Sequence, residues 1–260
     1  MKIKLYQVDA FADRVFEGNP AAVCPLDNWL DDHVLQKIAE ENNLSETAFF
    51  VRTDNNIQLR WFTPLEEVDL CGHATLAAAY VLYKHCNYSS PSATFDTKSG
   101  QLFVTKIDTG FSMDFPVSML QAVDAPAELL LGLGGHKAQT ILAGFDYVVV
   151  LNSVKEVMDL NPDFSQWLNL DLRGVVVTAQ GTDVDFVSRC FFPKLRVNED
   201  PVTGSAHCEL APYWGARLGL SVLCGRQLSQ RSGLVHCQLV ADRVILTGNV
   251  VEYMMGEINV

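Results

Sequence analysis

Residues 60–82 of this 260-residue chain have the sequence RWFTPLEEVDLCGHATLAAAYVL. The pattern predicts a strand over 59–62, which Pro64 ends because a proline nitrogen cannot donate to a neighbouring strand. An acidic loop follows, and a helix is predicted from Gly72. Its four alanines favour helix formation, and its small and apolar side chains predict burial on most sides.

A second copy of this pattern lies at residues 189–214, RCFFPKLRVNEDPVTGSAHCELAPYW. Both stretches contain Arg-x-Phe-x-Pro, then acidic residues, then a glycine and a small residue that open a helix. Gly72-His73-Ala74 corresponds to Gly204-Ser205-Ala206. A helical segment and an apolar strand precede each copy, so we interpret the chain as a duplication that gives two similar lobes.

The two lobes are predicted as 1–117 and 118–260, with the active-site cleft between them. Helices are expected over 31–42, from Gly72, over 127–133, over 154–168 with a break at Pro162, and from Gly204. Strands are expected over 3–11, 21–24, 47–51, 59–62, 93–95, 100–107, 110–115, 145–151, 175–179, 184–192, 234–240, 243–247 and 250–255.

Composition limits the classes of protein to consider. An apolar content of 48% is ample for two cores. There is no run of 18 apolar residues, and the N-terminus alternates like a strand without a signal-peptide block, so we expect a cytoplasmic protein with no membrane segment. The formal charge of −12 argues against nucleic acid as a partner, because phosphate binding needs a basic surface.

Cysteine usage favours reduced thiols. The chain has seven cysteines, an odd count without CxxC spacing, so structural zinc and a disulfide framework are not expected. We expect mostly buried free thiols and no bound metal.

Chemistry is predicted at the two helix starts, Gly72 and Gly204. Helix N-termini present unpaired N–H groups and a positive dipole end, which together bind a carboxylate. The same site stabilises an enolate formed by removing a proton next to a carboxylate. A glycine at each start lets a substrate approach the backbone.

Glu46 is the candidate proton-transfer group. If the strand starts at Leu44, alternation places Leu44, Glu46, Ala48 and Phe50 on one face, with the carboxylate among apolar neighbours. Burial disfavours the charged form of a carboxylate, which suits a general base or acid at neutral pH. The alternative is a solvated residue that flanks the strand. The second lobe has no carboxylate at the corresponding strand start, and this asymmetry favours the functional interpretation.

The other candidates lie close to the helix starts and each has a structural alternative. His73 could shuttle protons or act as a structural donor. Asp200 could bind substrate, relay protons or form a turn, and Ser205 could donate to substrate or cap a helix. Cys71 could be a nucleophile or acid, although a packed thiol is favoured, and His207 is expected to be structural. Asn19 lies in a Gly-Asn-Pro turn that could face the cleft or simply turn the chain.

Six segments resemble the PhzF family of phenazine-biosynthesis isomerases over nearly the whole chain. They are Asp9-Ala10-Phe11, Gly18-Asn19-Pro20-Ala21-Ala22-Val23, Asn43-Leu44-Ser45-Glu46-Thr47-Ala48-Phe49, Arg60-Trp61-Phe62-Thr63-Pro64, Glu67-Val68-Asp69-Leu70-Cys71-Gly72-His73-Ala74-Thr75 and Glu199-Asp200-Pro201-Val202-Thr203-Gly204-Ser205-Ala206-His207. Gln230-Arg231-Ser232-Gly233 also fits, although Gly-Gly after the arginine is more usual.

The resemblance implies an α+β fold of the diaminopimelate-epimerase type, with two pseudo-symmetric lobes, each a barrel-like mixed sheet around a central helix. It implies cofactor-free proton transfer on a small, sometimes cyclic, carboxylic acid and a homodimer. In the phenazine isomerase the acid is trans-2,3-dihydro-3-hydroxyanthranilate. Carried onto this sequence, Glu46, His73 and Asp200 are catalytic. The implied substrate-binding residues are Asn19, Gly72, Gly204 and Ser205.

Two alternatives stay open. Racemases of this fold use one thiol in each lobe, and here the first thiol position resembles Cys71. The second lobe has no thiol before Gly204, and Cys208 comes after it, which makes a two-thiol racemase hard to reconcile with the chain. A thiol-dependent epimerase that combines Cys71 with another group is the second hypothesis, and a non-catalytic binding protein on the same fold is the third.

Overall fold

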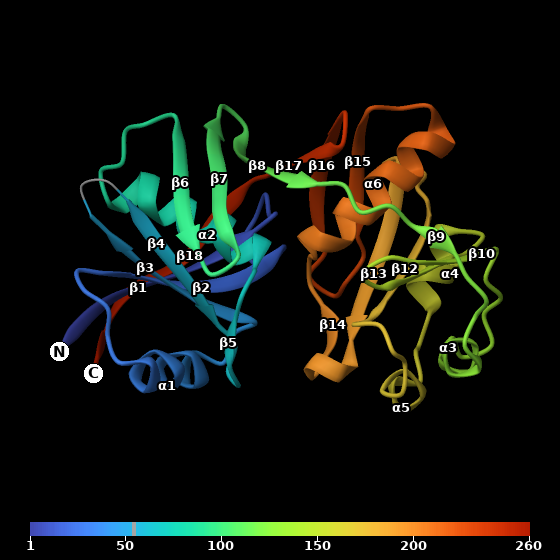
Figure 1. The fold of residues 1–260 in the computed structure, drawn as a ribbon, viewed down its shortest axis with the longest axis horizontal. Coiled ribbons are helices and arrows are strands. Elements are labelled where there is room, and N and C mark those ends of the chain that lie inside the picture. The colour runs from blue at the N-terminus through green and yellow to red at the C-terminus, as the bar shows by residue number, and fades with distance from the viewer. Residues whose placement is uncertain (54–55) are drawn as a thin grey trace. The chain divides into compact units, whose positions relative to one another are not determined.

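The computed structural model describes residues 1–53 and 56–260 and divides them into two compact units. Unit 1 comprises Met1–Asp114 and Thr247–Val260, and unit 2 comprises Phe115–Leu246. The boundary predicted after residue 117 lies close to Asp114, where the first segment of unit 1 ends. The prediction that the C-terminal residues belong to the second lobe is wrong, because Thr247–Val260 is part of unit 1. The last strand, β18 (Val250–Asn259), pairs antiparallel with the first, β1 (Lys2–Ala10), as Figure 1 shows in red and blue. Alternation reveals a strand but not which strand it pairs with.

Unit 1 is a mixed sheet around one helix. Along the sheet, β18–β1 and β1–β2 are antiparallel, β2–β3 is parallel, β3–β4 is antiparallel, β4 pairs with β5 (antiparallel) and β6 (parallel), and β6–β7 and β7–β8 are antiparallel. Its further elements are β2 (Asn19–Leu26), α1 (Asp32–Asn42), β3 (Glu46–Arg52), β4 (Ile57–Phe62), β5 (Glu67–Val68), α2 (Gly72–His85), β6 (Ser92–Thr97), β7 (Gly100–Ile107) and β8 (Gly110–Pro116).

Helix α2 is the central helix of unit 1. Its small and apolar side chains from Ala74 to Ala79 are fully buried, and so are Val81 and Leu82. Because alanines cover so little of the helix, β1, β2 and β3 can pack close around it. Helix α1 instead buries only one face, Leu35, Ile38 and Ala39, on the outside of the sheet. Asp31, the residue before it, occupies the N-cap position but makes no side-chain cap bond.

Unit 2 repeats this pairing. The β9–β10 and β10–β11 pairs are antiparallel, β11–β12 is parallel, β12–β13 is antiparallel, β13 pairs with β14 (antiparallel) and β15 (parallel), and β15–β16 is antiparallel. The elements are β9 (Gln121–Ala122), α3 (Ala127–Gly132), β10 (Thr140–Ala143), β11 (Tyr147–Val150), α4 (Val154–Asp159), α5 (Phe164–Trp167), β12 (Val175–Gln180), β13 (Phe186–Phe192), η1 (Pro193–Leu195), β14 (Val197–Asp200), α6 (Gly204–Leu218), β15 (Val222–Gln227), β16 (Gly233–Val240) and β17 (Arg243–Gly248).

Helix α6 holds the place in unit 2 that α2 holds in unit 1. It buries both apolar residues, such as Leu210 and Trp214, and polar ones, His207 and Glu209. The predicted helix over 154–168 is two short helices, because Pro162 cannot continue a helix. All seven cysteines are free thiols and five of them are buried, as expected.

Each copy of the repeated pattern contains an arginine–glutamate ion pair with the same geometry. Arg60 in β4 donates through Nε and Nη2 to the two oxygens of Glu67, at 2.7 and 2.8 Å. Arg189 in β13 does the same to Glu199, at 2.7 and 2.9 Å. In each unit the fork ties a central strand to the short strand that leads into the central helix. The duplication inferred from Arg-x-Phe-x-Pro therefore has a structural basis in these arginines.

Strand β3 begins at Glu46 rather than at Leu44. Residues Thr47 to Val51 are all buried, so both faces of this strand are covered and simple alternation does not describe it. The expected grouping of Leu44 with Glu46 on one strand face is therefore wrong. Among the described residues no helix is both long and apolar enough to cross a membrane.

The first prediction concerns the Arg60–Glu67 fork. Both side chains are largely buried, at 19% and 14% exposed, so Glu67→Gln removes a charge from a partly desolvated pair. We expect the free energy of unfolding to fall by about 1–3 kcal/mol, the usual worth of a charge-assisted hydrogen bond. Urea unfolding followed by circular dichroism measures it.

Glu257→Gln is the matched control. It breaks a pair with Lys2 in the same unit whose side chains are 70% and 53% exposed. Such surface pairs contribute about 0–1 kcal/mol. Equal losses in the two variants would show that the fork stabilises unit 1 no more than an exposed ion pair does.

Candidate functional site

Glu46 is the first residue of β3, placed opposite Ala21 of the parallel strand β2. Its Oε2 lies 3.1 Å from Nε2 of His73, the second residue of α2. The Glu46 side chain is 18% exposed and the His73 side chain 7%. The carboxylate is therefore the more accessible member of the pair, and the imidazole lies behind it.

The other ring nitrogen of His73 has two neighbours. Nδ1 lies 3.3 Å from Nδ2 of Asn19 and 3.5 Å from Sγ of Cys71. When the ring carries a single proton, these contacts favour the proton on Nε2, on the side of the carboxylate, because the amide and the thiol beside Nδ1 can both donate. The three neighbours fix the orientation of the ring.

Asn19 reaches this ring because of the turn before it. Gly18 has φ +67, and a Cβ there would lie 2.2 Å from the carbonyl oxygen of Ala10. Only glycine fits that conformation and that close approach. The turn delivers Asn19 as the first residue of β2, fully buried beside the helix start.

Burial and neighbouring charges shift the pKa of His73 in opposite directions. Burial lowers its pKa, but the neighbouring Cys71 and Glu46 outweigh burial and raise the pKa well above its usual value. Burial, reinforced by the Glu46 carboxylate, raises the pKa of the Cys71 thiol. The sulfur therefore stays protonated near neutral pH, while the imidazole takes up a second proton readily.

Glu46, Cys71 and His73 are also the residue types that bind metals, and their ligand atoms lie within 4.8 Å of one another. His73, however, faces the thiol with Nδ1 and the carboxylate with Nε2. One ion on one ring nitrogen cannot also occupy the place to which the opposite nitrogen points. The arrangement suits proton sharing better than joint ligation of an ion.

The predicted residues of unit 2 form a separate cluster. Ser205 is the second residue of α6, and its Oγ accepts from Nη2 of Arg173 at 2.9 Å. Asp200 ends β14 and accepts from the Thr203 hydroxyl at 2.5 Å, and Gln227 donates to the Asp200 carbonyl at 2.7 Å. Gly204 is the first residue of the helix.

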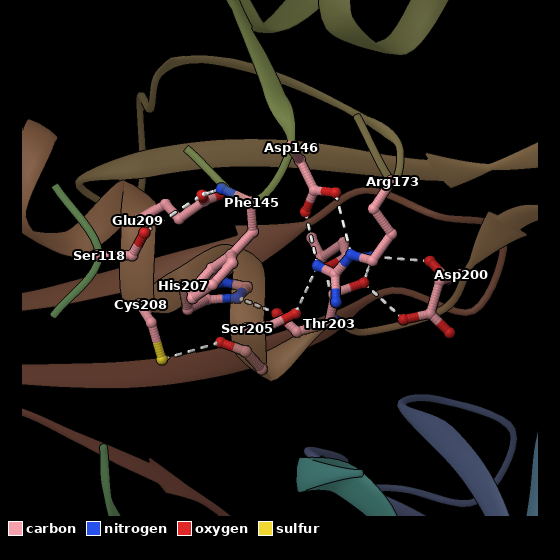
Figure 2. A network of polar contacts seen from close by, with 12 residues as sticks. Ser118, Phe145, Asp146, Arg173, Asp200, Thr203, Ser205, His207, Cys208 and Glu209 are labelled. Carbon is pink, nitrogen blue, oxygen red and sulfur yellow. Dashed lines mark hydrogen bonds and ion pairs between the residues drawn. The ribbon is translucent and has the colours of Figure 1, made fainter. Parts of the chain in front are cut away.

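Arg173 and Asp146 were missed by the sequence analysis (Figure 2). Nε of Arg173 donates to Oδ1 of Asp146 at 3.0 Å, and Nη2 donates to Oδ2 at 2.6 Å. Asp146 is fully buried, and the Arg173 side chain is 38% exposed. A usable signal was present, because each residue comes one or two positions before an apolar strand, β11 or β12.

His207 lies in the interior of unit 2, which agrees with the structural role predicted for it. It is fully buried, and burial lowers its pKa to about 4. The ring is therefore neutral near pH 7, and Nδ1 donates to the carbonyl oxygen of Thr203 at 2.8 Å. This bond satisfies a carbonyl at the start of α6 rather than facing a substrate.

Glu209 is a buried acid that the sequence did not single out. Burial, reinforced by Asp146, raises its pKa to about 7. Oε1 accepts from the backbone N–H of Phe145 at 2.5 Å, while Oε2 has no hydrogen-bond partner among the described residues. The acid is therefore harder to ionise than an ordinary glutamic acid.

The structure thus gathers the predicted residues into two groups. Unit 1 brings together Glu46, His73, Cys71, Asn19 and Gly72, and unit 2 brings together Asp200, Gly204 and Ser205. At the N-cap position that Cys71 occupies before α2, unit 2 has Thr203 before α6.

A family model and two relatives match nearly the whole chain. The family model described as "Phenazine biosynthesis-like protein" (PhzC-PhzF) matches residues 8–256. An uncharacterized isomerase of Pseudomonas aeruginosa is 51% identical, with 100% of both chains covered. An uncharacterized isomerase of Halalkalibacterium halodurans is 44% identical, with 99% of both chains covered.

Solved structures agree with the expected fold class. A PhzF-family protein of Enterococcus faecalis has a TM-score of 0.97 at 47% identity, with 100% of both chains covered. A hydroxyproline epimerase of Agrobacterium vitis has a TM-score of 0.61 at 10% identity, with 99% of this chain and 92% of the epimerase covered, which is a likeness of fold alone. The α+β, epimerase-like architecture is confirmed.

The second prediction concerns Glu209 and pH. Its pKa is raised in the folded state above the ordinary value of 4.5, to about 7, so its stabilising contribution is complete below pH 4.5 and is lost as the pH rises through 7. Glu209→Gln keeps the acceptor for Phe145 but cannot ionise. We expect the stability difference between wild type and variant to change by on the order of 2–3 kcal/mol between pH 4.5 and 8.

Urea unfolding at several pH values measures this difference. Glu128→Gln, at an exposed carboxylate of the same unit, is the control and should leave the pH profile unchanged. A Glu209→Gln profile parallel to that of wild type would show that folding does not raise the pKa of this acid.

Proposed function

Because this chain belongs to the PhzC/PhzF family of phenazine biosynthesis-like proteins and is an isomerase, we propose that it moves a proton within a small carboxylic acid without a cofactor. We assign the proton transfer to Glu46. The observation that supports this assignment is the contact between the Glu46 carboxylate and the buried imidazole of His73.

Glu46 is the member of the cluster best suited to meet a substrate. Its side chain is more exposed than that of His73, and Cys71 is buried. The imidazole lies 3.1 Å from one carboxylate oxygen, and we assign the other oxygen to the substrate proton. A base positioned in this way contributes about 10²–10⁴-fold to a proton-transfer rate.

In the proposed reaction Glu46 removes a proton from a carbon next to a conjugated system. The electron pair of the broken C–H bond delocalises over that system. The protonated Glu46 exchanges its proton with solvent and then delivers a proton to another carbon. Substrate and product have the same atoms and electrons, so no oxidant or reductant takes part.

Helix α2 supplies stabilisation for the anion. Gly72 and His73 are its first residues, so the unpaired N–H groups and positive end of a 14-residue helix begin beside the proposed base. Donors already in place where negative charge develops lower the barrier of such reactions. We therefore propose Gly72 as a contact for the carboxylate or enolate of the substrate.

The substrate is proposed to be a small carboxylic acid, with a ring acid such as trans-2,3-dihydro-3-hydroxyanthranilate as the first candidate. The family membership supports this class. Asp200, Gly204 and Ser205 are proposed as further substrate contacts, since they lie at a second helix start with the same order of elements.

The third prediction tests Glu46. In D₂O, wild-type protein should convert the ring acid and introduce deuterium at carbon, as followed by proton NMR and mass spectrometry. Glu46→Gln keeps the shape but cannot accept a proton, so exchange should fall by about 10²–10⁴-fold. Binding of the aromatic acid 3-hydroxyanthranilate should change little.

Glu40→Gln is the control. Glu40 is an exposed carboxylate of α1 paired with Lys37 in the same unit, and its loss should leave exchange unaltered. Full exchange by Glu46→Gln would end the assignment. A wild-type protein that binds the acid without any exchange would favour the non-catalytic hypothesis.

The thiol-dependent alternative has less support. The raised pKa of Cys71 keeps the sulfur protonated, whereas a base or nucleophile must be a thiolate. Thr203 stands at the equivalent N-cap position of unit 2, and a hydroxyl is a far weaker acid than a thiol. We therefore propose that Cys71 helps to orient His73.

The fourth prediction separates these roles. Cys71→Ser preserves a small donor next to Nδ1 of His73, so isomerisation in the same NMR assay should stay within about tenfold of wild type. A thiol that acts directly on the substrate would instead make the serine variant as inactive as Glu46→Gln. Cys24→Ser, at another buried thiol of unit 1, controls for packing.

A further inference from the structure

Equivalent positions in the two units can be found from the pairing of β3 with β4 and of β12 with β13. In β3 and β4, Phe49 lies opposite Arg60, and in β12 and β13, Val177 lies opposite Arg189. Both arginines make the same fork with a glutamate. The residue three positions before Phe49 is Glu46, and the residue three positions before Val177 is Gly174. Arg173 therefore adjoins the position that Glu46 holds in unit 1.

The second residue of the central helix, His73 in α2 and Ser205 in α6, contacts side chains of opposite charge in the two units. In unit 1 a carboxylate, Glu46, lies 3.1 Å from His73. In unit 2 a guanidinium, Arg173, donates to Ser205 at 2.9 Å. One unit presents a proton acceptor at its helix start, and the other presents hydrogen-bond donors.

Arg173 is held rigidly. Asp146 receives two of its N–H groups in a fork, and the guanidinium carbon lies 5.0 Å from the centre of the Phe192 ring. Figure 2 shows the guanidinium with Asp146 on one side and Ser205 on the other. A preorganised guanidinium loses little conformational entropy when it binds an anion.

Two donors of Arg173 stay available. A guanidinium carries five N–H groups. Nε uses one and Nη2 uses two, whereas Nη1 has no hydrogen-bond partner among the described residues. The side chain is 38% exposed, so Nη1 reaches solvent rather than being buried unpaired. Ser205, which accepts from Nη2, keeps its own hydroxyl proton to donate.

The start of α6 is not tightly packed at Gly204. A Cβ at Gly204 would meet only Leu246 Cδ1, at 3.8 Å, which is an ordinary contact. Packing within the described residues therefore does not require glycine there. A glycine is needed if a ligand approaches the backbone at this point.

The geometry points to Arg173 as a specificity-determining residue that binds the carboxylate of the substrate through Nη1, next to the Ser205 hydroxyl. Asp146 is then a positioning residue that aims the guanidinium. This inference rests on the proposed function, because it takes the substrate to be a carboxylic acid. It adds a cation that selects acids over uncharged analogues of the same shape.

The fifth prediction uses two ligands that differ only in the carboxylate. 3-Hydroxyanthranilate carries it and 2-aminophenol is the same ring without it. Isothermal titration calorimetry of the full chain should show that the acid binds more tightly to wild type. Arg173→Lys should weaken binding of the acid by about tenfold to hundredfold and leave 2-aminophenol within a factor of about two.

Lysine in place of arginine keeps a cation next to the buried Asp146. A neutral pair, Asp146→Asn with Arg173→Gln, removes the buried charge altogether and should show the same selective loss. Thermal unfolding checks that both variants fold. Arg226→Lys is the matched control, since Arg226 also pairs with one carboxylate, Asp183, in unit 2 and should leave both affinities unchanged.

Equal losses for both ligands in the Arg173 variants would make Arg173 merely structural and overturn the inference. So would a wild-type protein that binds the two ligands equally or binds neither. The outcome is independent of the proton-transfer assay: loss of deuterium exchange in Glu46→Gln together with unchanged acid binding in Arg173→Lys would leave the proposed function standing and refute this inference alone.

Discussion

The arginine–glutamate fork is the constraint on which the rest of each unit depends. Arg60 with Glu67, and Arg189 with Glu199, fasten the short strand before a central helix to a central strand. A bidentate pair fixes distance and orientation together, which a single hydrogen bond cannot do. The helix that follows must therefore begin at one place over the sheet. Its first residues are where polar side chains gather in both units.

On this shared framework the two units carry opposite chemistry. Unit 1 places a carboxylate against an imidazole, and unit 2 places a guanidinium against a hydroxyl. A duplicated backbone keeps equivalent positions while side chains diverge, so one helix start can specialise in proton transfer and the other in binding an anion. The buried Asp146 is costly to desolvate, and the cation that it orients compensates for that cost.

Local patterns predicted most of the elements but not the partners of their side chains. Pro64 and Pro162 mark breaks because proline cannot donate, and the alanines of α2 predict a buried helix. Glu46, His73 and Asn19 were predicted from the sequence as site residues, and they lie together in unit 1. Arg173, Asp146 and Glu209 were not predicted, because the contacts that make them notable are with residues distant in sequence.

The duplication and the two helix starts could be predicted from the sequence alone, because they follow from local periodicity and from turn and break residues, whereas the α+β class was implied by the family resemblance. Only the tertiary structure decided that β18 completes unit 1, that β3 is covered on both faces and that Glu209 is a buried acid. Strand pairing and desolvation arise from contacts between segments far apart in the chain, and no local pattern encodes them.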